Sequence, residues 1–110
     1  MKHQDETSAS LRSNNETDFS KAFARFESAV HEVIATGWDE PTRRYASDVS
    51  AALRDASKAA GWKETSGILH ALTSLLALPL GEILSIREAV RDKMLELLEL
   101  LLMSVRSQTA

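Results

Sequence analysis

The apolar residues of this chain recur at the spacing of a helical face, beginning with a group of aromatic and branched side chains. The members of this group follow one another at steps of three or four residues: Phe19, Phe23, Phe26, Val30 and Val33. That spacing places them on one side of an α-helix. Asp18 precedes the group, and its carboxylate suits the N-cap position, where it accepts hydrogen bonds from first-turn amides. The pattern predicts a first helix over residues 19–36.

A glycine followed by a tryptophan marks two further boundaries, at Gly37-Trp38 and, 24 residues later, at Gly61-Trp62. Glycine just past a helix adopts the left-handed conformation that ends it, and the apolar residue that follows packs back on the last turn. Pro41 suits the first turn of the helix between these glycines, because that turn needs no amide donor. We expect a second helix over residues 40–60. Its thin apolar face consists of Tyr45, Val49, Leu53, Ala56 and Ala60.

The remaining sequence predicts two more helices, one on each side of Pro79. The apolar stripe before the proline consists of Ile68, Leu69, Leu72, Leu75 and Leu76. The helix opens at Thr65 or Ser66, and helical dihedrals are disfavoured in the residue before a proline, so this stripe predicts a helix over residues 66–78. After an apolar connection, Ser85 and Glu88 have the spacing of a capping box, in which each side chain bonds to an amide near the other. The last helix is therefore expected over residues 85–106.

Together the four predicted helices belong to one domain, residues 18–110. Short connections favour antiparallel neighbours, so the expected fold class is all-α, either a small four-helix bundle or a compact four-helix array. Residues 1–17 are almost wholly polar and offer little apolar surface to offset the entropy of ordering the chain. We expect them to form a disordered N-terminal tail.

The last helix has more apolar surface than one packing face requires. Its main stripe consists of Ile86, Val90, Met94, Leu97, Leu98, Leu101 and Val105. Leu95, Leu100, Leu102 and Met103 lie outside that stripe, and leaving such side chains in water is unfavourable. We predict that these four residues form a protein interface, either in a homodimer or with another protein partner. The alternative is a central helix that its own chain buries.

Charge and composition narrow the classes of function. The chain has 13 Lys plus Arg and 16 Asp plus Glu, a net charge of -3, which does not favour binding to nucleic acid. It contains no cysteine, which excludes disulfides, thiolate metal sites and cysteine nucleophiles. Glu96 and Glu99 disfavour a membrane-surface role for the last helix. No apolar segment approaches the roughly 20 residues needed to cross a bilayer, and the first residues lack the apolar stretch of an export signal. We expect no membrane association and a cytoplasmic location.

His70 is the residue whose chemistry is most open to a functional interpretation. On the predicted third helix it lies away from the apolar stripe, beside the small residues Thr73, Ser74 and Ala77, where another protein can reach it. This arrangement resembles histidine phosphotransfer domains, small four-helix bundles with a phosphorylated histidine in a His-x-x-Lys-Gly pattern. The resemblance implies a signalling module with His70 as phosphoacceptor. Thr73 and Ser74 stand at the positions of Lys and Gly in that pattern, and an ordinary surface histidine is the alternative.

A second fragment, the seven residues from Thr42 to Asp48, has a helix start with an adjacent basic pair, Arg43 and Arg44. It resembles the opening of a helix in the N-terminal DNA-clamping domain of tyrosine recombinases. The resemblance implies a DNA-contacting helical domain. The alternative is the solvated start of an ordinary helix.

No pattern in the sequence indicates an enzyme, a metal site or a cofactor. His3, His31 and His70 lie in different predicted elements, without the converging ligands that a metal requires. There is no Gly-x-Ser-x-Gly elbow of a serine hydrolase and no glycine-rich phosphate loop, so we expect no small-molecule substrate. The expected function is a non-enzymatic helical protein-interaction or regulatory (adaptor) domain that self-associates through its C-terminal helix.

Overall fold

A computed structural model describes residues 20–109, in which the chain forms helices and connecting turns without strands. The helices are a first helix over residues 20–35, α2 (Glu40–Ala59), α3 (Lys63–Leu76), α4 (Leu80–Ser85) and α5 (Arg87–Thr109). The all-α prediction is confirmed, and one short helix, α4, is added to the four long ones that were expected. The tail predicted to be disordered, residues 1–17, lies outside the described residues.

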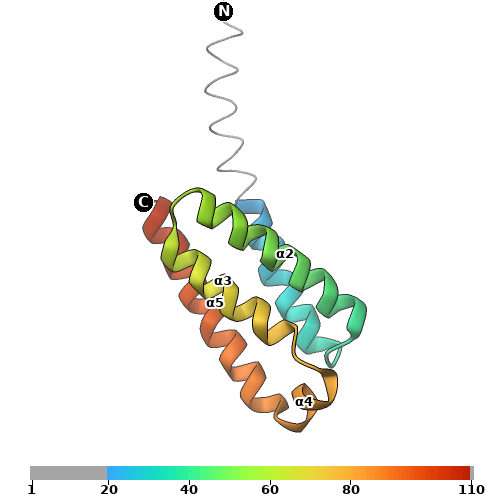
Figure 1. Cartoon of the computed structure of the whole chain (residues 1–110). Helices are drawn as coiled ribbons and strands as arrows, with labels where there is room; N and C mark the ends of the chain where they lie inside the picture. The colour runs from blue at the N-terminus through green and yellow to red at the C-terminus, as the bar shows by residue number, and fades with distance from the viewer. Residues whose placement is uncertain (1–19, 110) are drawn as a thin grey trace, which may run out of the picture.

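The four long helices run alternately in opposite directions along one axis (Figure 1). The first helix and α3 lead towards the end of the molecule where α4 lies, and α2 and α5 return to the other end. α2 lies along α3, and α3 lies along α5. This is the up-and-down arrangement in which short connections make sequential helices antiparallel neighbours.

Both glycine–tryptophan pairs end a helix in the way that the sequence predicts. The two glycines have positive φ angles, of 70° and 80°. After the first helix, the Trp38 amide donates to the Val33 carbonyl at 2.9 Å, and the Gly37 amide donates to the Ile34 carbonyl at 3.2 Å. These two bonds define a Schellman motif, and the turn at Gly61 repeats it after α2. Each turn satisfies carbonyls at the helix end and redirects the chain.

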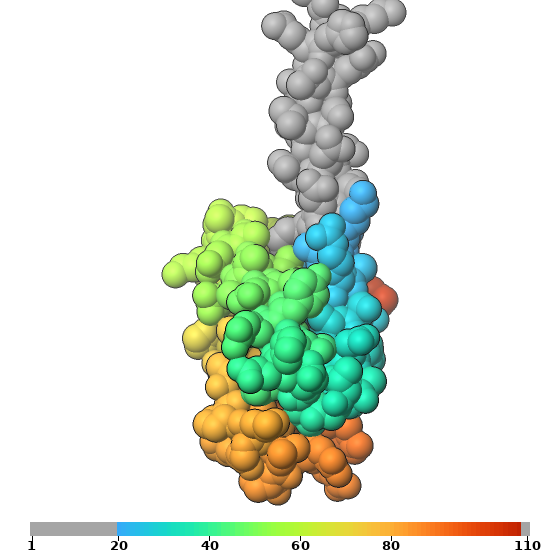
Figure 2. All heavy atoms as spheres, turned by 90° about the vertical axis from the view of Figure 1, so that its right-hand side faces the viewer, coloured from blue at the N-terminus to red at the C-terminus, as the bar shows by residue number. Residues whose placement is uncertain are grey.

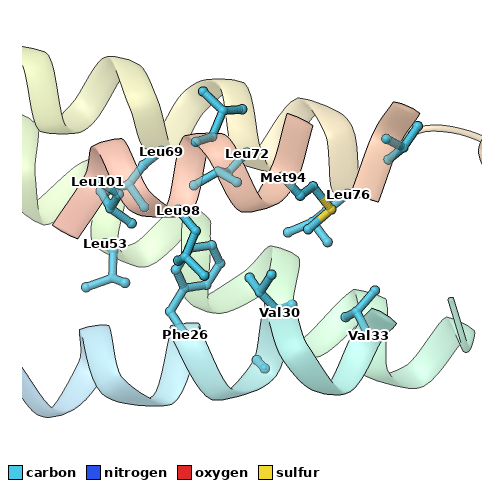
Figure 3. Close-up of a cluster of buried hydrophobic side chains, with 14 of the residues drawn as sticks. Phe26, Val30, Val33, Leu53, Leu69, Leu72, Leu76, Met94, Leu98 and Leu101 are labelled. Atoms are coloured by element: carbon cyan, nitrogen blue, oxygen red, sulfur yellow. The ribbon is translucent and has the colours of Figure 1, made fainter. Parts of the chain in front are cut away.

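The core is built from side chains of all four long helices (Figure 3). Those labelled in the figure point towards one another between the ribbons: Phe26, Val30, Val33, Leu53, Leu69, Leu72, Leu76, Met94, Leu98 and Leu101. Trp38 belongs to the same core and is 1% exposed, so its predicted packing after Gly37 is confirmed. Its φ of 71° is costly for a residue with a side chain, and burial of the indole offsets that cost.

Small residues, rather than the predicted apolar face, bring α2 into the core. Its buried residues are Ala46, Ser50, Leu53 and Ser57. Tyr45, predicted to face the core, is 52% exposed. The Ser50 hydroxyl lies 3.2 Å from the Leu69 carbonyl and 2.7 Å from Thr73 Oγ1, so α3 satisfies a buried polar group of α2. The buried face keeps Leu53 of the predicted face and replaces its other members by their neighbours Ala46, Ser50 and Ser57, while Val49 is partly buried. Hydrophobicity alone does not identify a hydrogen-bonded serine such as Ser50 as a core residue.

α3 begins at Lys63, three residues earlier than predicted, with Trp62 in the N-cap position. Thr65, one of the two residues at which this helix was predicted to open, is buried within it, and its Oγ1 lies 2.6 Å from Ser104 Oγ of α5. The turn at Gly61 explains the early start, because the Trp62 amide closes α2 and the next residue already enters α3. The hydroxyl of Thr65 then joins α3 to α5 inside the bundle.

The short helix α4 occupies the segment that was predicted to be an irregular apolar connection. Ser85 is its last residue and donates its hydroxyl to the Glu82 carbonyl at 2.8 Å, so the predicted capping box does not start α5. Ile86 follows, and its carbonyl accepts from the Val90 amide at 3.0 Å. The Ile86 side chain, predicted to lie in the core, is 48% exposed, because Ile83 of α4 is the residue buried at this end.

Replacing Gly37 by alanine should lower the free energy of unfolding by about 1 kcal/mol, because a Cβ disfavours its positive φ. The matched control is Gly67→Ala within α3, where an added Cβ meets no atom within 4 Å. That change should raise stability by about 0.8 kcal/mol through helix propensity. Urea denaturation followed by circular dichroism measures both, and effects of the same sign would contradict the left-handed turn at Gly37.

The Thr65–Ser104 hydrogen bond should be visible in a double-mutant cycle. Thr65→Val leaves the Ser104 hydroxyl buried without this partner, and we expect a loss of about 1–3 kcal/mol. The double variant Thr65→Val, Ser104→Ala removes both hydroxyls and should lose less than the two single variants added together. Strict additivity in chemical denaturation would argue against the bond.

Candidate functional site

The exposed apolar side chains are concentrated on α4 and α5. Within residues 20–109, the large apolar residues that are exposed are Tyr45, Leu80, Leu84, Ile86, Leu95, Leu100 and Met103. Six of these seven lie between the start of α4 and the last turns of α5, and Tyr45 alone lies elsewhere, on α2. In Figure 2 the segment around α4, in orange, forms the lower end of the molecular surface. A concentration of this kind is typical of a surface that binds another protein.

The four residues predicted to form an interface lie outside the core, but they do not share one strip of α5. Leu95, Leu100 and Met103 are 37%, 44% and 59% exposed, and Leu102 is partly buried. Successive residues of a helix are about 100° apart around its axis. Leu95 and Leu102 are therefore close together on one edge of the outward face. Leu100 lies about 140° around the helix from Leu95, with Met103 between them.

One strip of exposed residues begins at Ile86, just before α5, and continues along α5 at alternating steps of three and four. We call it the outer strip, and its members are Ile86, Ala89, Lys93, Glu96, Leu100, Met103 and Ser107. In its middle, Lys93 Nζ lies 3.7 Å from Glu96 Oε2. Apolar residues lie on both sides of this pair of opposite charges. The outer strip therefore has a pair of opposite charges in its middle and apolar residues towards its ends.

The opposite edge of the outward face mixes leucines with carboxylates, and we call it the acidic edge. Its members are Glu88, Asp92, Leu95, Glu99, Leu102 and Arg106. Asp92 accepts from the neighbouring Arg91 at 3.2 Å, and both side chains are exposed. Covering Leu95 on this edge would also desolvate the surrounding carboxylates, which is costly unless a partner supplies cations.

His70 is exposed on α3, and it lines an open groove of about 850 Å³ between α2 and α3. Lys58 and Lys63 also line the groove, together with Arg54, whose Nε lies 3.2 Å from Asp55. These cations lie on the same surface as His70, although the residue at the lysine position of the phosphotransfer pattern is a threonine. The assignment of His70 as a phosphoacceptor stays a prediction.

Arg43 and Arg44, the basic pair of the second fragment, make different contacts. Arg43 Nε donates to the Trp38 carbonyl and its Nη1 to the Leu78 carbonyl, each at 3.1 Å. The guanidinium therefore joins the turn before α2 to the turn after α3. Arg44 is exposed and pairs with Glu40 at 2.8 Å. Contact with DNA through both residues would require Arg43 to leave two backbone carbonyls, so its observed role is structural.

Comparison with family models, curated proteins and solved structures gave no significant match to this chain. No helix in the described range is long and apolar enough to cross a membrane. Residues 20–109 also contain no group of three or more His, Cys, Asp or Glu residues that could hold a metal ion.

Sequence reasoning identified Leu100 and Met103 of the outer strip and missed the rest of it. Ile86 was assigned to the core because its spacing continues the buried stripe. Ala89, Lys93 and Glu96 were not predicted to lie in the interface, because that prediction rests on large apolar residues alone. The signal available was the regular alternation of three and four residues from Ile86 onwards.

Replacing each of the two arginines by methionine should lower the free energy of unfolding by clearly different amounts. Arg43→Met removes two hydrogen bonds from a charged, half-buried group, and we expect a loss of about 1.5–3 kcal/mol in the free energy of unfolding. Arg44→Met removes one exposed ion pair and should change stability by less than about 0.5 kcal/mol. Urea denaturation of both variants measures the difference, and equal losses would refute the structural role of Arg43.

Proposed function

We propose that this protein is a non-enzymatic protein-interaction domain, of the regulatory or adaptor class, that forms a homodimer through the outward face of α5. The observation that carries the proposal is the concentration of exposed large apolar residues, six of seven in the described range, on α4 and α5. The rest of the described surface has one such residue, Tyr45. Three of the six, Leu95, Leu100 and Met103, lie on α5, and an interaction surface on that helix accounts for them.

The order of charge along α5 favours a second copy of the same helix as the partner. Lys93 and Glu96 are exposed one turn apart in the outer strip, with apolar residues on both sides of them. In an antiparallel pair of these helices, each Lys93 can lie opposite the partner's Glu96, and the helix dipoles are favourably opposed. A two-fold axis produces such a pair, and two-fold dimers are the commonest oligomers of soluble proteins.

Covering the half-exposed side chains supplies the association energy. Ile86, Leu100 and Met103 are each roughly half exposed. Full burial of a large apolar side chain contributes roughly 1.5–3 kcal/mol, so covering the exposed half of each contributes about 1 kcal/mol. The loss of translational and rotational freedom on association opposes this gain. A reversible, concentration-dependent dimer is expected, rather than a pair of chains that fold only together.

Light scattering across a dilution series tests the homodimer. The wild-type protein should change from the mass of two chains to that of one chain as it is diluted. Met103→Glu places a charge on the outward face, at a position 59% exposed, and should shift this transition to higher concentration. Tyr45→Glu is the matched control, because Tyr45 is 52% exposed on α2 and away from α5. It should leave the transition unchanged.

Two results would refute the proposal. One is a wild-type mass of a single chain at every concentration. The other is a Tyr45→Glu variant that dissociates as readily as Met103→Glu, which would place the contact elsewhere. Circular dichroism melts of both variants show whether the fold is retained. We expect that it is, because both substituted side chains are exposed.

A further inference from the structure

We infer that the dimer is an antiparallel pair of α5 helices that meet along the outer strip in one particular register. The facing pairs are Ile86 with the partner's Met103, Ala89 with the partner's Leu100, and Lys93 with the partner's Glu96. By two-fold symmetry each pair occurs twice. This inference rests on the proposed homodimer and specifies the residues that form its interface.

The spacing of the outer strip is that of a coiled-coil seam. From Ala89 to Ser107 its residues lie on α5 at alternating steps of three and four, and every one of them is exposed. Ile86 precedes the helix at the same spacing and is also exposed. An average step of 3.5 residues keeps such a strip facing a partner helix along its whole length. The part of the strip on α5, from Ala89 to Ser107, covers about 27 Å, at 1.5 Å for each residue. A second α5 helix would therefore offer a seam of the same length.

In the inferred register, each layer joins side chains of compatible chemistry. The layers on both sides of the centre are apolar. In them Ile86 faces the partner's Met103, and Ala89 faces the partner's Leu100. The central layers join a lysine to a glutamate. Each Lys93 ammonium then lies near its own Glu96 carboxylate, at 3.7 Å in the isolated chain, and near the partner's Glu96. The four charges alternate in sign around the two-fold axis.

Neighbouring registers lose this match. Sliding one helix by seven residues in one direction places Lys93 opposite the partner's Met103 and Leu100 opposite the partner's Glu96. Sliding it in the other direction places Ile86 opposite the partner's Glu96 and Lys93 opposite the partner's Ala89. Each alternative covers charged groups with apolar ones, which is unfavourable. The charge pair at the centre therefore selects one register, as polar residues do in coiled-coil seams.

The acidic edge does not offer an equivalent seam. When the full edges of two antiparallel helices are aligned, Leu95 faces the partner's Glu99 and Leu102 faces the partner's Asp92. Both leucines then lie against carboxylates. Of the four residues predicted to form the interface, Leu100 and Met103 are thus assigned to the seam, and Leu95 and Leu102 are not.

Charge reversal in the central layer tests the register. Lys93→Glu makes every charge of that layer negative, and Glu96→Lys makes every charge positive, so each variant alone should dimerise at least about tenfold more weakly than wild type. Mixing the two variants in equal amounts should restore dimerisation, because each reversed residue now faces an opposite charge. Asp92→Lys on the acidic edge is the control of equal charge change, and it should leave the dimer affinity unchanged within about twofold.

Disulfide trapping provides a second readout, made clean by the absence of natural cysteines. A mixture of Ala89→Cys and Leu100→Cys chains should form a cross-linked heterodimer under mild oxidation, seen on a non-reducing gel. Either variant alone should not cross-link. In the inferred register, equivalent positions of the two helices are offset by 11 residues, about 16 Å along the axis, too far for a disulfide.

The outcomes test the inferred register independently of the proposed homodimer. A wild-type dimer whose charge-reversed variants gain nothing from mixing would overturn the register and leave the homodimer standing. Cross-linking of Ala89→Cys alone, as efficient as in the mixture, would overturn it in favour of a parallel arrangement. A wild-type protein that is monomeric throughout would overturn both proposals.

Discussion

A four-helix bundle can bury only one face of each helix, and this constraint determines what α5 exposes. The stripe of α5 that includes Met94, Leu98 and Leu101 is buried in the core, and Leu100 and Met103 are exposed. In the observed bundle the other helices cover the side of α5 that includes Met94 and Leu101, and its far side stays exposed. The excess apolar surface is therefore a property of the packing geometry, and it is also the reason to assign α5 an interaction role.

Two kinds of local interaction hold the helices in the positions that create this surface. The left-handed turns at Gly37 and Gly61 end the first helix and α2 and redirect the chain, so that antiparallel packing follows from local geometry. Hydroxyl contacts then connect neighbouring helices, between Ser50 and Thr73 for α2 and α3 and through Ser104 for α5. Because these polar groups are satisfied within the core, small residues can occupy positions that larger apolar residues would otherwise fill.

The described surface has three places that bear on function. His70 shares its groove with Lys58 and Lys63, and its role as a phosphoacceptor stays a prediction. Arg43 donates to two backbone carbonyls. Of the basic pair in the DNA hypothesis, only Arg44 has an exposed side chain. The outer strip, in contrast, has apolar residues, opposite charges and a regular repeat on one exposed line. Residues at alternating steps of three and four can face a second helix along their whole length.

The sequence by itself determined the helical class, the ends of the first helix and of α2, and the burial of Trp38, because periodicity and glycine turns act over a few residues. It did not determine which residues of α2 are buried, since Ser50 becomes a core residue only when the Leu69 carbonyl of α3 lies beside it. Likewise, Ile86 continues an apolar stripe in sequence, and only the short helix α4 turns its side chain outward. The crowding of α5 with leucine was evident from the residues alone. Which strip of that helix remains exposed was decided by the positions of the other helices, because burial depends on neighbours that are distant in sequence.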